Sequence, residues 1–114
     1  MIWGEIRLAE NRRQNDMKYF ALIYYVVEGF VSRRTPFREE HLRLAREAKQ
    51  RGELLLAGAL GDPADRALLV FGAQDGSVAE DFARNDPYVI NGLVFRWEVQ
   101  PWAVVIGGDA GGVK

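Results

Sequence analysis

The residue of this chain that points most directly to chemistry is His41, its only histidine. An imidazole ordinarily changes charge near neutral pH, so it can serve as a general base or a general acid. The surrounding sequence predicts a helix, because Thr35 can cap its start, Pro36 suits the first helical position and Gly52 can end it. His41 is therefore expected near the beginning of a helix.

This helix, expected over residues 35–52 after a turn at residues 28–32, should carry His41 on its apolar side. At about 3.6 residues per turn, one stripe of the helix collects a set of mostly apolar residues. Those residues are Phe37, His41, Leu44, Ala45 and Ala48. The ring should therefore face the core side rather than water. A core histidine satisfied by one hydrogen bond explains this pattern equally well.

The composition limits the class of protein. With 114 residues, the chain is long enough for one domain with a genuine core, and 48% apolar and 27% charged residues are typical of a globular protein. Its 15 basic and 16 acidic residues nearly cancel, so no field of one sign favours nucleic acid as a partner. No apolar run is long enough to span a membrane.

The numbers of cysteine and histidine residues limit the kinds of site that the chain can form. The chain has no cysteine, which excludes disulfides and a thiol nucleophile, and a single histidine argues against a metal site built from this chain alone. We expect no metal and no organic cofactor. A cytoplasmic location is compatible with a chain that lacks disulfides.

Runs of aromatic and β-branched residues, separated by turn residues, predict the strands. The run 18–27 is the clearest, and because it is apolar on both faces, both faces should be covered. A capping box at Ser77 and Glu80 predicts a second helix, while Pro101 interrupts the last strand and residues 102–106 continue extended. The expected order is strand 18–27, helix 35–52, strand 53–60, strand 67–73, helix 77–84 and strand 93–99.

This order, β-α-β-β-α-β, predicts a ferredoxin-like α+β fold. Right-handed crossovers place both helices on one face of a four-stranded antiparallel sheet. The other face remains apolar, which is unusual on a monomer, so we expect a homodimer that pairs through its sheet faces. In the last strand, alternation places four residues on one face: Leu93, Phe95, Trp97 and Val99.

The two ends of the chain differ from its centre. Residues 1–16 are expected to be an N-terminal extension or arm, because Met17 resembles a natural start and no secretory apolar region precedes it. The glycine-rich residues 107–114 are expected to form a flexible tail.

Four short motifs occur in order along the chain. They are Arg34-x3-Arg38-x2-His41-Leu42, Gly52-x-Leu54-Leu55-x-Ala57-Gly58, Asp86-Pro87-Tyr88-Val89-x2-Gly92 and Val99-x-Pro101. Each is weak alone, but together, on the expected β-α-β-β-α-β frame, they resemble the YciI-like (YCII-related) family. The resemblance covers residues 17–106 as one domain.

The resemblance implies a dimeric α+β barrel and an active site centred on one histidine and one aspartate, which correspond here to His41 and Asp86. One family member eliminates chloride from a chlorinated hydroxyhydroquinone, so the frame can support proton transfer on small rings. Two positions depart from the family pattern. Ala59 stands where members often have proline, and Glu28 is the acid nearest to where many have aspartate.

Several further residues are candidates for the same site. Arg34 and Arg38 could hold a carboxylate or phenolate, since guanidinium groups match planar anions, although a solvated surface pair is the alternative. Tyr88 could donate to a substrate oxygen or simply pack. Gly58 could admit a ligand close to its strand, and Glu28 competes with Asp86 as the partner of His41.

These observations leave three function hypotheses. The first is a lyase or isomerase that needs no cofactor, in which a His41–Asp86 pair moves a proton on a small anionic cyclic or unsaturated metabolite. The alternative is a non-catalytic dimeric module that binds a small molecule in the same pocket. A purely structural dimer is a third reading.

Overall fold

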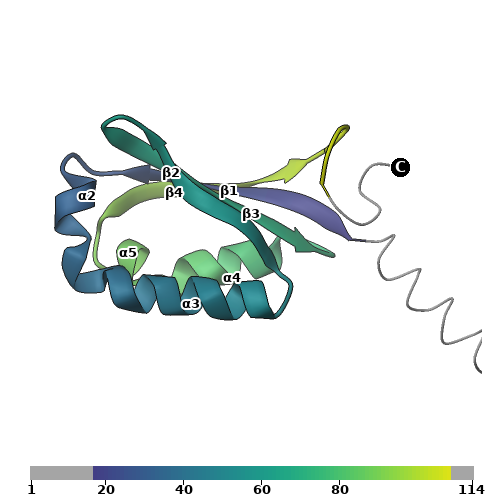
Figure 1. The fold of residues 1–114 in the computed structure, drawn as a ribbon, viewed down its shortest axis with the longest axis horizontal. Coiled ribbons are helices and arrows are strands. Elements are labelled where there is room, and N and C mark those ends of the chain that lie inside the picture. Colours follow the sequence, from purple (N-terminus) through teal and green to yellow (C-terminus); the bar gives the residue numbers. More distant parts are fainter. Residues whose placement is uncertain (1–16, 109–114) are drawn as a thin grey trace, which may run out of the picture.

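The computed structural model of this chain describes residues 17–108, and the expectations for residues 1–16 and 109–114 lie outside this part. The elements follow the expected order, with short helical turns added (Figure 1). They are β1 (Lys18–Val26), α2 (Phe30–Arg33), the 3₁₀ helix η1 (Thr35–Phe37), α3 (Arg38–Gln50), β2 (Leu54–Gly61), β3 (Ala64–Ala73), α4 (Ser77–Asn85), α5 (Pro87–Ile90) and β4 (Val94–Trp102).

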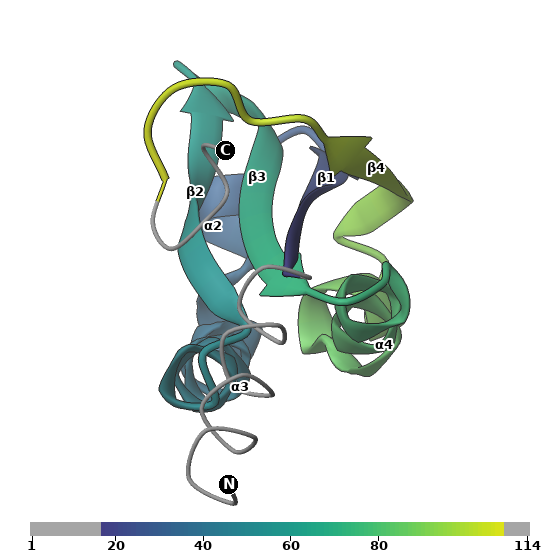
Figure 2. The same ribbon diagram turned by 90° about the vertical axis from the view of Figure 1, so that its right-hand side faces the viewer.

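The strands of the described region form one antiparallel sheet in the order β2-β3-β1-β4. Both long helices lie on the same face of this sheet, with α3 beneath β2 and α4 beneath β1 and β4 (Figure 2). This is the expected ferredoxin-like α+β fold, in which right-handed crossovers bring the two helices to one side.

Alternate residues of β1 point towards the helices and form the core. Phe20, Leu22 and Tyr24 are almost fully buried, and they pack in one cluster with Phe71 of β3 and Phe82 of α4. The rings of Phe71 and Phe82 have their centres 5.5 Å apart. Burying a large apolar side chain contributes about 1.5–3 kcal/mol, so this cluster holds α4 firmly against the sheet.

The starts of both long helices differ from the prediction. Thr35 does not cap a helix, because its hydroxyl donates to the carbonyl oxygen of Ser32 and α3 begins only at Arg38. Ser77 is the first residue of α4 rather than its cap, and its backbone N–H and its hydroxyl both donate to Asp75. A nearby carboxylate accepts more strongly than a serine hydroxyl, which explains the different start of α4.

The helical turn α2 occupies most of the segment that the sequence predicts as a turn. Gly29, with φ of +76°, takes the left-handed conformation that lets the chain leave β1 and enter α2. Phe30 is buried, and its ring meets the ring of Tyr88 edge-on with centres 5.3 Å apart. This contact brings the segment carrying Arg34 close to α5.

The predicted face of the last strand is wrong at one position. Phe95 is 68% exposed, whereas Trp97 packs against the core. The pairing of β1 with β4 shifts between Tyr25 and Val26, and Phe95 is the residue left without a partner there, so the strict alternation of side chains breaks at this position. Pro101 lies inside β4, which tolerates it because β4 is an edge strand.

The sheet face opposite the helices carries apolar side chains that no described helix covers (Figure 1). The register pairs Ile23 with Leu68 and Leu56 with Val70 on this face. Leu56 is 71% exposed. The homodimer expected to cover this face stays a prediction.

Candidate active site

A buried carboxylate, Asp86, lies at the centre of the candidate site. It is 0% exposed and forms the N-cap of α5. Its Oδ1 accepts a hydrogen bond from the backbone N–H of Tyr88 at 3.0 Å, and its Oδ2 accepts one from the hydroxyl of Tyr24 at 2.7 Å. Nδ1 of His41 lies 3.0 and 2.9 Å from the two oxygens. Donors from β1, α3 and α5 thus offset the cost of burying this side chain.

This arrangement assigns the hydrogen on the His41 ring. Both oxygens of Asp86 already accept a hydrogen bond, from Tyr88 and from Tyr24, so the contact with Nδ1 is favourable when Nδ1 is the ring nitrogen that carries the hydrogen. Nε2 of the neutral ring is then an acceptor. A base whose charged form would rest against a buried carboxylate has the geometry that general base catalysis requires.

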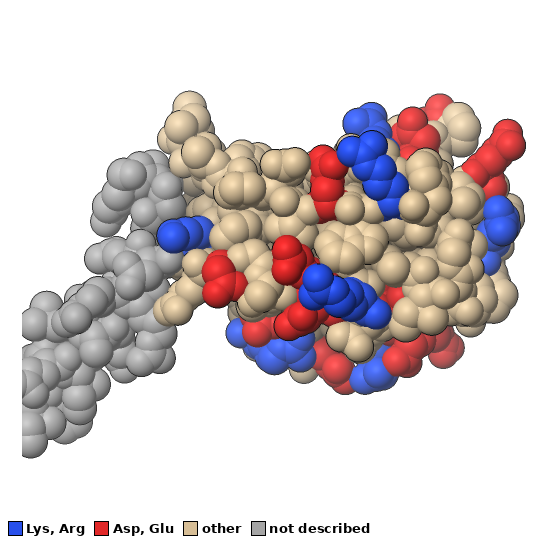
Figure 3. Space-filling view, turned by 180° about the vertical axis from the view of Figure 1, so that it is seen from behind, with Lys and Arg blue, Asp and Glu red and all other residues tan. Residues whose placement is uncertain are grey.

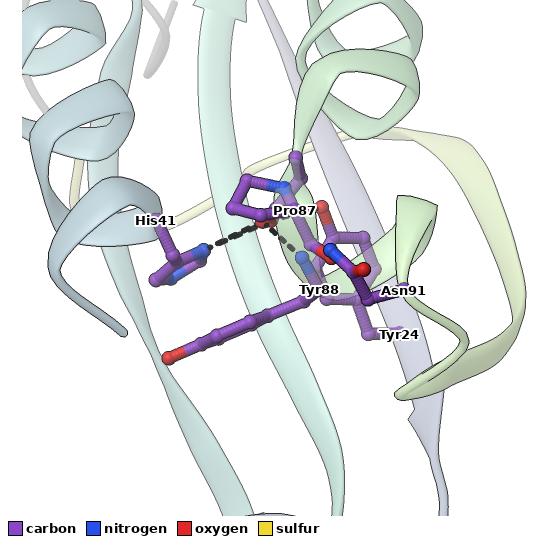
Figure 4. Close-up of polar contacts among 6 residues, drawn as sticks. Tyr24, His41, Pro87, Tyr88 and Asn91 are labelled. Carbon is purple, nitrogen blue, oxygen red and sulfur yellow. Dashed lines mark hydrogen bonds and ion pairs between the residues drawn. The ribbon is translucent and has the colours of Figure 1, made fainter. Parts of the chain in front are cut away.

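The imidazole is also held from one side by Tyr88. The two rings are nearly parallel, with centres 4.0 Å apart and planes inclined by 12°. Figure 4 shows Tyr88 lying beneath the His41 ring, with its hydroxyl extended away from Pro87. Stacking on one face and the contact with Asp86 at Nδ1 together restrict how the ring can turn.

A cavity of about 170 Å³ opens beside His41. Its walls come from the α2–α3 segment, from α5 and from three strands of the sheet. The lining residues are Tyr24, Phe30, Arg34, Arg38, His41, Leu42, Ala45, Ala57, Gly58, Ala59, Ala67, Leu69 and Tyr88. Small side chains from β2 and β3 leave the space open, so a small molecule could reach the imidazole.

Two guanidinium groups, Arg34 and Arg38, line this cavity, and neither forms an ion pair with a carboxylate in residues 17–108. Arg34 also lies over the ring of Phe30, with its guanidinium carbon 5.4 Å from the ring centre. Two cations in a largely apolar cavity favour an anionic occupant.

The hydroxyl of Tyr88 is a buried polar group whose hydrogen meets no acceptor in the described part of the chain. Burial raises the pKa of Tyr88 above its ordinary value, while the charges of Arg34 and Arg38 and a donor contact from Arg38 act in the opposite direction. A buried hydroxyl that lacks an acceptor is costly, and because Tyr88 lines the cavity, an acceptor atom of a bound molecule could satisfy it.

Of the two remaining candidates from the sequence, Gly58 and Glu28, only one lines the cavity. Gly58 lines the cavity, and a Cβ added there would meet no atom within 4 Å, so the space beside its backbone is open. Glu28 is exposed and does not line the cavity. Asp86, not Glu28, is the carboxylate that contacts His41. The roles of the candidates that line the cavity stay predictions.

Tyr24 is the site residue that sequence reasoning missed. The run 18–27 predicts a strand, but nothing in its pattern tells which tyrosine meets a polar partner across the core. The available signal is the alternation, which places Tyr24 on the same face as Leu22, where its buried hydroxyl requires an acceptor.

On the face drawn in Figure 3, positive and negative side chains are interspersed. No three His, Asp or Glu side chains gather as metal ligands within residues 17–108. None of the helices described here is long and apolar enough to cross a membrane. The cytoplasmic location stays a prediction.

Comparison with known proteins places the fold. Residues 17–103 match the family model of the YCII-related domain. No curated protein matches the chain. A solved structure, the 5-chloro-2-hydroxyhydroquinone dehydrochlorinase (TftG) of Burkholderia phenoliruptrix AC1100 in complex with 2,5-dihydroxybenzoquinone, matches with a TM-score of 0.61 and 20% identity. The match covers 74% of this chain and 92% of that one.

Alkaline pH should destabilise the fold through Tyr24. Burial, followed by the charge of Asp86 and the hydrogen bond to it, raises the pKa of Tyr24 above its ordinary value of 10.0. The protonated hydroxyl therefore stabilises the fold fully below about pH 10, and this contribution is lost as the pH rises further. Urea unfolding at several alkaline pH values, combined with tyrosinate absorbance, measures it.

Tyr24→Phe should flatten this alkaline slope in the free energy of unfolding. Tyr25→Phe, one residue along the same strand and on the opposite face, is the matched control and should keep the slope. Equal slopes in both variants would contradict the assignment.

Proposed function

This chain belongs to the YCII-related family, and we propose that it is an enzyme that transfers a proton on a small anionic cyclic or unsaturated metabolite. The observation that supports this best is the imidazole of His41, which lines a cavity while its Nδ1 lies 2.9 Å from the buried carboxylate of Asp86. His41 is the only imidazole among the side chains that line this cavity, and the imidazole is the side chain best suited to take up and release a proton in proton-transfer chemistry.

In the proposed reaction, Nε2 of His41 removes a proton from a substrate C–H or O–H group. The imidazolium that forms is stabilised by Asp86, which keeps its negative charge. In an elimination, the electron pair of the broken bond forms a double bond as the leaving group departs with its electrons. In an isomerisation, the same imidazolium returns the proton to another atom. Neither route needs a metal or an organic cofactor.

The substrate class follows from the cavity. Arg34 and Arg38 would hold a carboxylate, phenolate or enolate, and the hydroxyl of Tyr88 would donate to an oxygen of the same molecule. The volume of about 170 Å³ suits a single small ring or a short chain. The structural neighbour TftG, described as a dehydrochlorinase, makes an elimination on a hydroxylated ring a reasonable first choice.

We further propose that two copies pair through the open sheet faces as a dimeric α+β barrel. Leu56 and Leu60 are both exposed on this face, at 71% and 37%, and Trp102 at 44% lies on β4 beside β1. Apolar area removed from water on pairing contributes about 25 cal/mol per Å², which favours association.

His41→Gln should abolish proton transfer while leaving the fold intact, because glutamine can contact Asp86 but cannot serve as the base. We expect a loss of about a hundredfold or more. A thermal-shift screen of small carboxylic acids and phenols identifies ligands. Deuterium incorporation from deuterium oxide into those ligands, followed by NMR, then measures the proton transfer directly.

Arg38→Gln should weaken substrate binding and raise KM. Arg46→Gln, an exposed position on the same helix outside the cavity, is the matched control and should leave KM unchanged.

Deuterium incorporation at the wild-type rate in His41→Gln would refute the enzymatic function. Tight binding by the wild type and by His41→Gln, with no incorporation by either, would favour the non-catalytic binding module.

The dimer has its own test. Leu56→Asp places a charge on the open sheet face and should convert a dimer into a monomer in size-exclusion chromatography with light scattering. Ile90→Asp changes an apolar residue that is 66% exposed on α5 and should leave the dimer intact. A wild-type monomer at micromolar concentration would contradict the proposed pairing.

A further inference from the structure

One hydroxyl links the sheet to the buried carboxylate of the candidate site. Tyr24 donates to Oδ2 of Asp86 at 2.7 Å, although the two residues are 62 positions apart in the sequence. Tyr24 is 1% exposed and Asp86 is 0% exposed, so water does not compete for this hydrogen bond. The bond links β1, an inner strand of the sheet, to the junction between α4 and α5.

The other two donors to Asp86 do not connect it to the sheet. The N–H of Tyr88 belongs to the helical turn that Asp86 itself caps, so it moves with that turn. His41 is on α3, and it is the group whose position must be explained. Among the residues described, the Tyr24 hydroxyl is therefore the polar contact that fixes the carboxylate relative to the sheet.

The contact with Tyr24 also decides how the carboxylate is turned. With Oδ1 bound to the Tyr88 N–H and Oδ2 bound to the Tyr24 hydroxyl, both oxygens remain within 3.0 Å of Nδ1 of His41. Without the hydroxyl, Oδ2 keeps only its contact with Nδ1 of His41, and the carboxylate is free to turn about its Cβ–Cγ bond. The hold on Nδ1 would then weaken.

We propose that Tyr24 is a positioning residue, which fixes Asp86 so that His41 keeps its hydrogen on Nδ1 and presents Nε2 to the cavity. The inference rests on the proposed role of His41 as a base. It extends that role to a residue of the opposite layer of the fold, which acts on the substrate only through Asp86 and His41. Because burial keeps the Tyr24 hydroxyl protonated, this donor is present throughout the physiological pH range.

The test measures which ring nitrogen of His41 carries the hydrogen. With histidine labelled with nitrogen-15, the ring nitrogens distinguish the two neutral tautomers, and the single histidine of the chain makes the spectrum unambiguous. Wild-type protein should show one tautomer, with hydrogen on Nδ1. In Tyr24→Phe the share of the other tautomer should rise by about tenfold, the effect of losing one charge-assisted hydrogen bond.

Tyr25→Phe is the matched control and should give the wild-type spectrum, because Tyr25 lies on the opposite sheet face beneath the guanidinium of Arg96. A wild-type tautomer ratio in folded Tyr24→Phe would overturn the inference. If that variant does not fold, the exchangeable protons of the wild type provide the test. A slowly exchanging Tyr24 hydroxyl proton close to the His41 Nδ1 proton supports the inference, and the absence of such a proton overturns it.

The tautomer measurement does not depend on turnover. If His41→Gln keeps full proton transfer while Tyr24→Phe disturbs the tautomer, the proposed function fails and the positioning by Tyr24 stands. If proton transfer is lost in His41→Gln but Tyr24→Phe leaves the ring unchanged, the function stands and the positioning fails.

Discussion

The hydrogen bonds around the buried carboxylate of Asp86 hold the candidate site together. Burying an ionised group costs several kcal/mol unless donors replace the water that it loses. Here the donors come from Tyr24, His41 and the backbone of Tyr88, which belong to three different elements. Because each element is placed by its own packing, the carboxylate is satisfied only when the whole fold has formed. Because donors from three elements must meet at this one carboxylate, the fold of the domain also positions the imidazole that lines the cavity.

The sheet and the helices contribute differently to this site. The apolar core fixes α4, and the helix cap at Asp86 sets the direction of the carboxylate. The opposite wall of the cavity is formed by residues without bulk, Ala57, Gly58 and Ala59, so that space remains beside the imidazole. Two arginines from the α2–α3 segment complete the wall and supply positive charge. A rigid base thus faces an open, cationic space, which suits a small anion.

Much of this was predictable from the sequence. Hydrophobic runs and turn residues predicted the ferredoxin-like order of elements, and helical periodicity placed His41 inward. Two local details were harder to predict. Asp75, rather than Ser77, is the polar group that accepts hydrogen bonds at the start of α4, and the pairing of β1 with β4 shifts next to the exposed Phe95. The Tyr24 contact was beyond sequence reasoning, because it joins residues far apart in the chain and depends on tertiary packing. The periodicity of a strand specifies a face but not a partner.

The most direct test of this account is the free energy of unfolding of Asp86→Asn, measured by urea denaturation beside Asp81→Asn. Both changes remove one negative charge, but the Asp81 side chain is 71% exposed on α4 whereas Asp86 is buried. We predict that Asp86→Asn lowers the free energy of unfolding by about 3 kcal/mol, because an amide cannot accept from all three donors. Asp81→Asn should change it by less than about 0.5 kcal/mol. Equal stability of the two variants would contradict the central role of the buried carboxylate.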